Sequence, residues 1–248
     1  IRRVKGNGED LFRFREKTLF AAHEERKKAH AASGRPAPRG RIGLPRLFFL
    51  HDLLPFYSTL LWELGFEPVL SGPTSRRVVA QGIEGALADT CFPVKAALGH
   101  MRAMAESGLD RLFAPSVVDL STPGDAGGSS LSCPLTQSFP YQAKAAFPDI
   151  GIVAPAIIQR LGEKALAEEI GESLGVPARE VLRALPVARA AQDDFARTLA
   201  AKGREVLENL KGRALVIIGR AYNAFDPGMN LGIPAKLASL GETAIPMD

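Results

Sequence analysis

Residues 41–70 read RIGLPRLFFLHDLLPFYSTLLWELGFEPVL, and this stretch decides the fold. The apolar run Ile42–Leu50 predicts a short strand, and a helix is expected to follow over Asp52–Leu64. Gly65 suits the residue that ends a helix, and Phe66–Leu70 predicts the next strand. A strand, a helix and a strand in succession indicate an α/β protein with a parallel sheet.

The end of the chain repeats this order. Ala214–Gly219 predicts a buried strand, Asn230–Leu240 predicts a helix, and Thr243–Ile245 predicts a second strand. Leu240-Gly241 stands between helix and strand as Leu64-Gly65 does in the first stretch. The repetition therefore predicts two similar β-α-β units, each with a parallel sheet.

Further helices and strands are expected between these two units. They are helices over Ser75–Gln81 and Pro93–Ser107, a strand at Leu112–Ala114, a helix over Pro134–Phe147 that Pro140 breaks, and a strand at Ile150–Ala154. The loop over 119–132 is long, and loops of this length in compact domains are usually functional or disordered. Residues 157–211 predict three helical segments, with breaks at Gly175–Pro177 and near Pro186.

We expect four parts along the chain. They are an N-terminal helix and linker (1–40), a first α/β domain with both cysteines (41–156), a helical insert (157–212) and the truncated start of a second α/β unit (213–248). The chain begins without Met and stops as an apolar strand is being formed, which predicts a segment of a longer polypeptide.

The charge distribution excludes several classes of partner. The formal net charge is only +4, and much of the basic excess lies within residues 1–41. No nucleic-acid-binding motif accompanies these residues, so a solvated helix is favoured over a nucleic-acid-binding tail. No signal-peptide pattern is present, and no apolar run approaches the roughly 18 to 20 residues that span a bilayer. We therefore expect a soluble, cytoplasmic protein that binds neither nucleic acid nor membrane.

The chain has two cysteines, Cys91 and Cys133, and they are the main candidates for a site. Cys91 lies in Asp-Thr-Cys-Phe-Pro-Val-Lys (89–95), Cys133 lies in Ser-Cys-Pro after a glycine-rich loop, and each is expected to open a helix. Loops that leave the carboxyl ends of parallel strands converge on one edge, where the thiols could meet. A helix N-terminus favours a thiolate. The alternative is two unrelated buried thiols, because free cysteines are commonly buried.

Neighbouring polar residues are expected to play smaller parts. His100 lies nine residues after Cys91, about 13 Å along a helix, so we expect it to pack or hydrogen-bond rather than to act in catalysis. Lys95 either offsets thiolate or phosphate charge or is simply exposed. The loop over 220–228 contains no dinucleotide or Walker motif, and the chain has no Gly-x-Ser-x-Gly elbow, which disfavours ATP hydrolysis and serine-hydrolase chemistry.

Five sets of motifs together resemble the 2-hydroxyacyl-CoA dehydratase superfamily. They are similar above all to the dehydratase-like region of the large CoA-substrate-specific enzyme activase proteins. The motifs are Ile42-Gly43-Leu44-Pro45-Arg46, Pro55-Phe56-Tyr57 with Leu64-Gly65-Phe66, Cys91-Phe92-Pro93-Val94-Lys95 with Gly99-His100, Cys133-Pro134-Leu135-Thr136-Gln137, and Gly219-Arg220-Ala221-Tyr222-Asn223 through Asp226-Pro227-Gly228-Met229-Asn230. Each motif is weak alone, but the five occur in the expected order from about residue 40 to the end.

The resemblance implies two flavodoxin-like α/β units and an iron-sulfur cluster, of the 4Fe-4S type, held by loop cysteines. By position, Cys91 and Cys133 match the cluster ligands of that superfamily. Its members accept a low-potential electron from an ATP-driven activator and use it on a CoA thioester in anaerobic metabolism. Here Cys-Pro-Leu-Thr-Gln replaces the expected Cys-Pro-Tyr-Val-Gln and no third cysteine exists, so the ligand set within this chain is incomplete.

Two hypotheses of different classes follow. The first is an iron-sulfur electron-transfer or dehydratase-like module of an ATP-driven 2-hydroxyacyl-CoA dehydratase activase system, inactive as a segment alone, with Cys91 and Cys133 as metal ligands and the glycine-rich loop screening the site. The second is a non-catalytic interaction module, without a cluster, that docks an activator ATPase or a partner subunit. Zinc binding is a third alternative, and homo-oligomer formation stays open.

Overall fold

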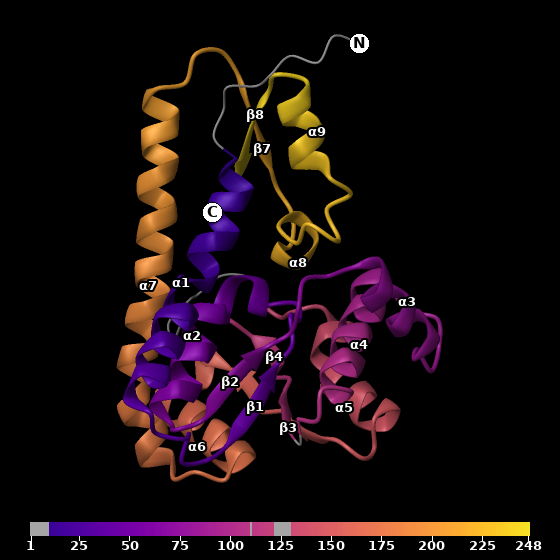
Figure 1. The fold of residues 1–248 in the computed structure, drawn as a ribbon, viewed down its shortest axis with the longest axis vertical. Helices are drawn as coiled ribbons and strands as arrows, with labels where there is room; N and C mark the ends of the chain where they lie inside the picture. The colour runs from indigo at the N-terminus through magenta and orange to yellow at the C-terminus, as the bar shows by residue number, and fades with distance from the viewer. Residues whose placement is uncertain (1–9, 110, 122–129) are drawn as a thin grey trace.

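The computed structural model describes residues 10–109, 111–121 and 130–248, in which helices alternate with parallel strands (Figure 1). The helices are α1 (Leu11–Ser33), α2 (Leu50–Glu63), α3 (Arg76–Glu84), α4 (Phe92–Ala105), α5 (Pro134–Ala146), α6 (Gly162–Leu174), α7 (Ala178–Glu208), α8 (Ala221–Ala224), α9 (Ile233–Ser239) and the 3-10 helix η1 (Gln159–Leu161). The strands are β1 (Arg41–Leu44), β2 (Glu67–Leu70), β3 (Arg111–Phe113), β4 (Ser116–Asp119), β5 (Gly151–Val153), β6 (Ala156–Ile158), β7 (Ala214–Ile217) and β8 (Thr243–Pro246). The predicted α/β class is confirmed.

The central sheet has the strand order β2-β1-β3-β5, and all its pairs are parallel. An Ala-Pro step ends β3 and β5 at the same level, and β4 and β6 continue beyond it as a second parallel pair. The N–H of Ala114 donates to the carbonyl of Val153 (2.8 Å), and the N–H of Ser116 donates to that of Pro155 (2.9 Å). Hydrogen bonding between the strands therefore continues past the prolines. The four chain segments have the strand order of a flavodoxin-like sheet.

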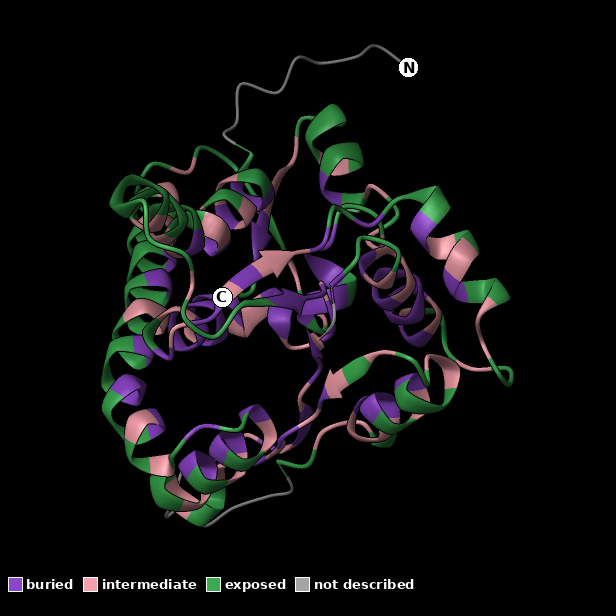
Figure 2. Ribbon diagram, turned by 60° about the horizontal axis from the view of Figure 1, so that its bottom comes forward, coloured by how far each residue is buried: buried purple, intermediate pink, exposed green. Residues whose placement is uncertain are grey.

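Helices cover both faces of this sheet. On one side α2 packs against α1 and α7, and α7 in turn packs on α6. On the other side α4 packs against α3 and α5 (Figure 1). Figure 2 shows the buried residues along the sheet and on the inward sides of the helices. Burial on both faces explains why the strands are continuous apolar runs instead of alternating patterns.

Helix α2 contains Pro55, which interrupts its hydrogen bonds in the middle of the core. The proline has no N–H for the carbonyl of His51, and the guanidinium of Arg15 in α1 donates to that carbonyl instead (3.0 Å). The next backbone pair is also open. The side-chain amide of Gln192 in α7 accepts from the N–H of Phe56 (3.3 Å) and donates to the carbonyl of Asp52 (3.0 Å). Two other helices thus supply the partners that α2 has lost.

Arg15 is only 1% exposed, although it belongs to the basic N-terminal region. Its guanidinium also binds the carboxylates of Asp52 (2.6 Å) and Asp248 (2.5 to 3.0 Å), and it lies over the ring of Phe225 at 3.8 Å. One face of α1 is therefore buried and bound to the last strand, instead of the whole helix being solvated. Asp10 caps the helix by accepting from the N–H of Arg13 (3.0 Å).

Several predicted element boundaries are wrong, among them the start of the helical region at residue 157, which lies in strand β6. Helix α5 continues through Pro140, and α7 continues through Pro186, because a proline removes one donor while the packing of the remaining turns keeps the helix intact. The last helix begins at Ile233, since Gly232 before it adopts a left-handed conformation with φ 67°. The predicted division into domains at residues 40, 156 and 212 stays a prediction.

The C-terminal unit consists of the parallel pair β7-β8 with α8 and α9. Strand β7 was expected to be buried, but this prediction is wrong: Val216 is 55% exposed, and Ile218, just beyond the strand, is 80% exposed. The reason is that the helices of this region pack mainly on β8, and among the described elements β7 has its main contacts with β8 alone. None of the helices within the described ranges has both the length and the apolar character that crossing a bilayer requires.

The opening at Pro55 gives a stability test. Gln192→Leu removes both partners of the open backbone pair, and we expect the free energy of unfolding to fall by about 1–3 kcal/mol in urea titrations. In a Pro55→Ala background the helix can close its own hydrogen bonds, so the same substitution is expected to cost much less. Gln142→Leu is the control, because that amide donates to a side chain of its own helix. Equal costs of Gln192→Leu in both backgrounds would contradict the assignment.

Candidate functional site

The candidate site lies at the carboxyl edge of the central sheet. The strand order reverses between β1 and β3, and ligands of open α/β sheets bind in the crevice at such a point. The segments that follow β1, β2 and β4 meet there. The loop over 220–228 of the C-terminal unit covers this edge and contacts all of them through the residues described below.

Cys133 is the N-cap residue of α5, as the sequence predicted. The hydroxyl of Thr136 donates to the carbonyl of Cys133 (2.7 Å), and the side-chain amide of Gln137 donates to the carbonyl of Ser132 (2.8 Å). The hydroxyl of Ser116 in β4 donates to the carbonyl of Gln137 (2.7 Å). The motif from Cys133 to Gln137 therefore fixes the thiol at the helix end and joins that end to the sheet.

The thiol of Cys133 accepts hydrogen bonds that lower its pKa. Partial burial alone would raise its pKa, but hydrogen bonds from the backbone of Leu135, from Arg220 and from the backbone of Thr136 outweigh it and lower the pKa. Arg220 comes from the C-terminal unit, and its guanidinium also donates to the hydroxyl of Tyr222 (3.0 Å). A cation from one unit is thus held against a thiol of the other.

Aromatic contacts hold this arrangement. The ring of Phe48, after β1, meets Phe139 of α5 and Tyr222 of α8 edge to face, with centroids 5.1 Å and 5.4 Å apart. Phe48 has a positive φ of 26°, a strained conformation for a bulky residue. A strained conformation persists only where the surrounding structure holds the residue firmly. Here the aromatic contacts among the three segments of the candidate site hold Phe48.

Cys91 is the N-cap residue of α4 and is exposed. Pro93 occupies the first turn, where its missing N–H costs nothing. The ammonium of Lys95 donates to the carboxylate of Asp89 at 2.8 Å. Of the two roles expected for Lys95, offsetting a thiolate is therefore the weaker, because Asp89 already balances its charge.

A cavity of about 290 Å³ lies between the segment before Cys91 and one side of α5, and neither cysteine lines it. Helices α4 and α5 contact each other beside it. Residues 86–90 line one side, and Leu135, Gln142 and Ala146 line the other. The hydroxyl of Thr90 is buried with no hydrogen-bond partner among the described residues. Cys91 and Cys133 are both free thiols, and the part of the chain that the structure describes holds no group of three or more metal-ligating side chains.

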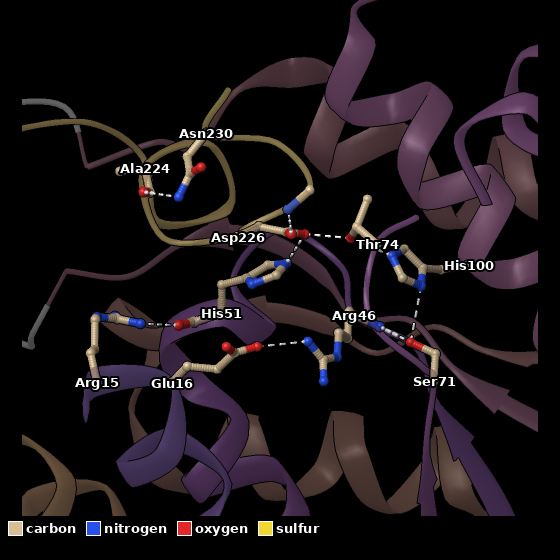
Figure 3. Close-up of polar contacts among 11 residues, drawn as sticks. Arg15, Glu16, Arg46, His51, Ser71, Thr74, His100, Ala224, Asp226 and Asn230 are labelled. Atoms are coloured by element: carbon tan, nitrogen blue, oxygen red, sulfur yellow. Dashed lines mark hydrogen bonds and ion pairs between the residues drawn. The ribbon is translucent and has the colours of Figure 1, made fainter. Parts of the chain in front are cut away.

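His100 has the structural role expected from the sequence. It is 1% exposed, its Nδ1 lies 3.1 Å from the hydroxyl of Ser71, and its Nε2 lies 2.8 Å from the hydroxyl of Thr74 (Figure 3). Ser71 accepts from the N–H of Arg46 (2.8 Å). The histidine therefore joins α4 to the ends of β1 and β2.

Asp226 is a central residue of the site that the sequence analysis did not single out as a ligand. Its carboxylate is 2% exposed and accepts from the hydroxyl of Thr74 (2.5 Å) and from the N–H of Gly228 (2.8 Å) (Figure 3). Gly228 lies so close to Thr74 that a Cβ on it would come within 2.4 Å of the Thr74 carbonyl oxygen. The signal available in sequence was Asp-Pro-Gly beside a helix start, which suits a tight turn and does not identify the partner.

Two buried histidines flank this carboxylate. His51 Nε2 lies 3.6 Å from Asp226, and burial lowers the pKa of His51 to about 3 with help from Arg46 and Arg15. Burial also lowers the pKa of His100 to about 4, against the opposing effect of Asp226. Both rings are therefore neutral at neutral pH, and the ring of His100 acts through its hydrogen bonds with Ser71 and Thr74.

Asp119, at the end of β4, is the second residue that sequence reasoning missed. It is 1% exposed and accepts from the hydroxyls of Ser121 (2.6 Å) and Ser130 (2.5 Å), which with the backbone of Ser121 lower its pKa to about 2. Arg160 lies 3.4 Å from its other oxygen. Asp119 thus joins the two ends of the glycine-rich loop, whose residues 122–129 lie outside the described residues together with their predicted screening role.

Helix α4 is positioned by two glycines at its crossing with α3. A Cβ on Gly99 would come within 1.8 Å of the carbonyl oxygen of Val78, and a Cβ on Gly82 within 1.7 Å of that of Lys95. Backbone therefore meets backbone at this crossing. The Gly-His pair at 99–100 has a physical explanation: the glycine lets α3 approach, and the histidine bonds the neighbouring loop.

The chain matches a known protein family. Residues 41–248 match the model of a protein family described as CoA enzyme activase uncharacterised domain (DUF2229). The matched part begins with β1 and contains both cysteines and the loop over 220–228. A search among curated proteins found no match.

The lowered pKa of His100 gives a pH test. An unfolded histidine titrates near pH 6.5, so between about pH 6.5 and 4 the unfolded chain binds a proton that the folded chain does not. The contribution of neutral His100 to the free energy of unfolding is therefore fully present above pH 6.5 and is lost as the pH drops towards 4. Urea titrations at a series of pH values give the slope of the free energy of unfolding against pH, and this slope measures the protons bound on unfolding. His100→Gln is expected to lower that number by about one. His30→Gln, on the surface of α1, is the control, and an unchanged slope in His100→Gln would refute the explanation.

The crossing of α3 and α4 gives a second test. Gly99→Ala places a methyl group against the backbone of α3, and we expect it to lower the free energy of unfolding by at least about 2 kcal/mol. Gly203→Ala in α7 is the matched control, because nothing lies within 4 Å of its added Cβ, and it is expected to raise stability by up to about 1 kcal/mol. Thermal unfolding of both variants measures the difference, and similar shifts in both would argue against close backbone contact at Gly99.

Proposed function

The chain belongs to the family of the CoA enzyme activase uncharacterised domain, and from this premise we propose that it is an iron-sulfur electron-transfer, dehydratase-like module of an ATP-driven activase system. The proposed system is a 2-hydroxyacyl-CoA dehydratase with its activator. Cys91 and Cys133 are the proposed ligands of the cluster. An activator ATPase, as a domain or a subunit, is the proposed partner, and a CoA thioester is the proposed substrate of the complete system.

The observation that carries the proposal is the placement of the two thiols. Each caps the N-terminus of a helix, α4 or α5, and these helices contact each other on one side of the sheet. The positive end of a helix dipole stabilises an anionic sulfur. Arg220 adds a full positive charge beside Cys133. A cysteine at the positive end of each of two helices that contact each other suits a group that is anionic and bound through sulfur.

The donors fit an iron-sulfur cluster in chemistry but not in number. A compact cluster takes three or four protein ligands, and two cysteines supply half of a four-ligand set. The remaining ligands would come from another segment or subunit. When bound, such a cluster supplies one-electron transfer at low potential. The residues of this chain would hold it: Cys91 and Cys133 as ligands, and Arg220 as a donor to the Cys133 sulfur.

A second candidate function, docking without a cluster, is favoured by the exposed apolar surface of the C-terminal unit. The exposed side chains of β7, of the loop before α9 and of α9 include Leu215, Val216, Leu231, Ile233 and Leu240. Large exposed apolar patches mark protein interaction sites, and this unit exposes apolar side chains on several of its elements. In this alternative the module binds an activator ATPase or a partner subunit through that surface and carries no metal.

The iron content of the protein distinguishes the iron-sulfur module from docking without a cluster. After anaerobic reconstitution of the complete polypeptide that contains this segment, we expect bound iron and sulfide, with visible absorption of a 4Fe-4S cluster. Cys91→Ser and Cys133→Ser should each reduce the iron content at least severalfold, because each removes one thiolate ligand. Ser138→Ala, an exposed change on α5, is the control. Undiminished iron and sulfide in Cys91→Ser would exclude the assignment.

The docking alternative makes the opposite prediction. It requires no iron after strict anaerobic purification, together with complex formation with the activator that survives both cysteine substitutions. Val216→Asp on the exposed face of β7 is expected to weaken that complex while the fold is retained. Zinc without sulfide in metal analysis, with no visible absorption, would instead support a zinc site.

A further inference from the structure

Arg220 is the residue through which the C-terminal unit reaches the thiol of Cys133. It is the N-cap residue of α8, and α8 lies at the end of the C-terminal unit that meets the first unit (Figure 1). Its guanidinium donates to the sulfur of Cys133 and to the hydroxyl of Tyr222, the latter at 3.0 Å. The backbone of Leu135 and Thr136 also donates to this sulfur. Arg220 therefore adds a full positive charge to two neutral backbone donors.

The packing of Tyr222 holds the guanidinium beside this sulfur. Tyr222 is 7% exposed, and its ring meets Phe48 edge to face, with centroids 5.4 Å apart. Phe48 also packs on Phe139 of α5, the helix that Cys133 caps. The loop that follows is fixed by the buried carboxylate of Asp226, which is bound to the segment after β2. The place of the cation therefore depends on how the C-terminal unit sits on the first unit.

A cation at this place affects how readily a group bound to the sulfur is reduced. Entry of one electron from the proposed activator makes a bound cluster more negative by one charge, with no bond formed or broken. Net charge and hydrogen bonds to the ligand sulfurs both set the reduction potential of such a cluster. A positive charge and an N–H donor stabilise the more negative state and so raise the potential. This effect falls as the distance between the charges grows.

We propose that Arg220 acts through the sulfur of Cys133 to raise the reduction potential of the site, and that docking of the C-terminal unit thereby regulates electron entry. This inference rests on the proposed iron-sulfur function and adds a regulation to it. The residue that receives the electron pair of the hydrogen bond lies in the first unit, and the residue that donates to it lies in the C-terminal unit.

Redox titration of the reconstituted complete polypeptide, followed by electron paramagnetic resonance, tests this regulation. Cys133→Ser identifies the signal of this site, because it removes one of the proposed ligands. Arg220→Gln is expected to lower the potential of that signal, so that the equilibrium constant for reduction falls about tenfold, which is ~59 mV for one electron. Arg220→Lys keeps the charge and should recover most of the shift.

Two further variants separate this role from a purely structural one. Tyr222→Phe keeps the ring on Phe48 but removes the hydroxyl that binds the guanidinium, so a smaller shift in the same direction is expected. Arg213→Gln is the matched control, because it removes an exposed cation of the same unit that is bound to Glu242 instead, and it should leave the potential unchanged. Iron content, sulfide content and the thermal midpoint are measured in every variant to show that the cluster and the fold are retained.

The outcomes distinguish this inference from the function on which it rests. At normal iron content, an unchanged potential in Arg220→Gln, or an equal shift in Arg213→Gln, would overturn the role of Arg220 and leave the proposed function standing. A wild-type polypeptide that holds no iron and sulfide after anaerobic reconstitution would overturn both.

Discussion

Pro55 removes a hydrogen-bond donor from the middle of the largely buried helix α2, and the architecture of the first unit depends on how that loss is compensated. Arg15 and Gln192 reach the open backbone of α2 from helices that are far away in sequence. A buried carbonyl without a partner is costly, so α1 and α7 are held at defined positions as well as packed. The same guanidinium then binds Asp248, and the break in α2 thereby fixes the C-terminal unit.

The carboxyl edge of the sheet is organised by a second buried polar group, Asp226. This carboxylate accepts from two neutral donors, the hydroxyl of Thr74 and the N–H of Gly228, and burial keeps both nearby histidines uncharged. The loop that carries it also delivers Arg220 to Cys133 and Tyr222 to Phe48. A displacement of the C-terminal unit would therefore alter the charge beside the thiol of Cys133 directly. The cysteines lie in the first unit, but their surroundings are shared between the two.

The sequence predicts the alternation of helices and strands well, because the apolar runs are long and glycines mark the helix ends. It also predicts that each cysteine caps a helix, since a proline follows each one closely. It fails where a distant partner decides the outcome. Pro140 and Pro186 read as breaks because packing is invisible in a local pattern. The roles of Asp226 and Asp119 cannot be predicted from their loops, because the hydrogen bonds to Thr74 and Ser130 exist only in the folded chain.

The bond between Arg15 and Asp248 joins residues 233 positions apart. During synthesis at 5 to 20 residues per second, α1 leaves the ribosome on the order of ten to fifty seconds before its carboxylate partner exists. Throughout that interval Asp52 is the acidic partner available to the guanidinium. The nascent N-terminal helix therefore docks in two stages, first on α2 and then on β8, and the order of these contacts follows the order in which the chain is made.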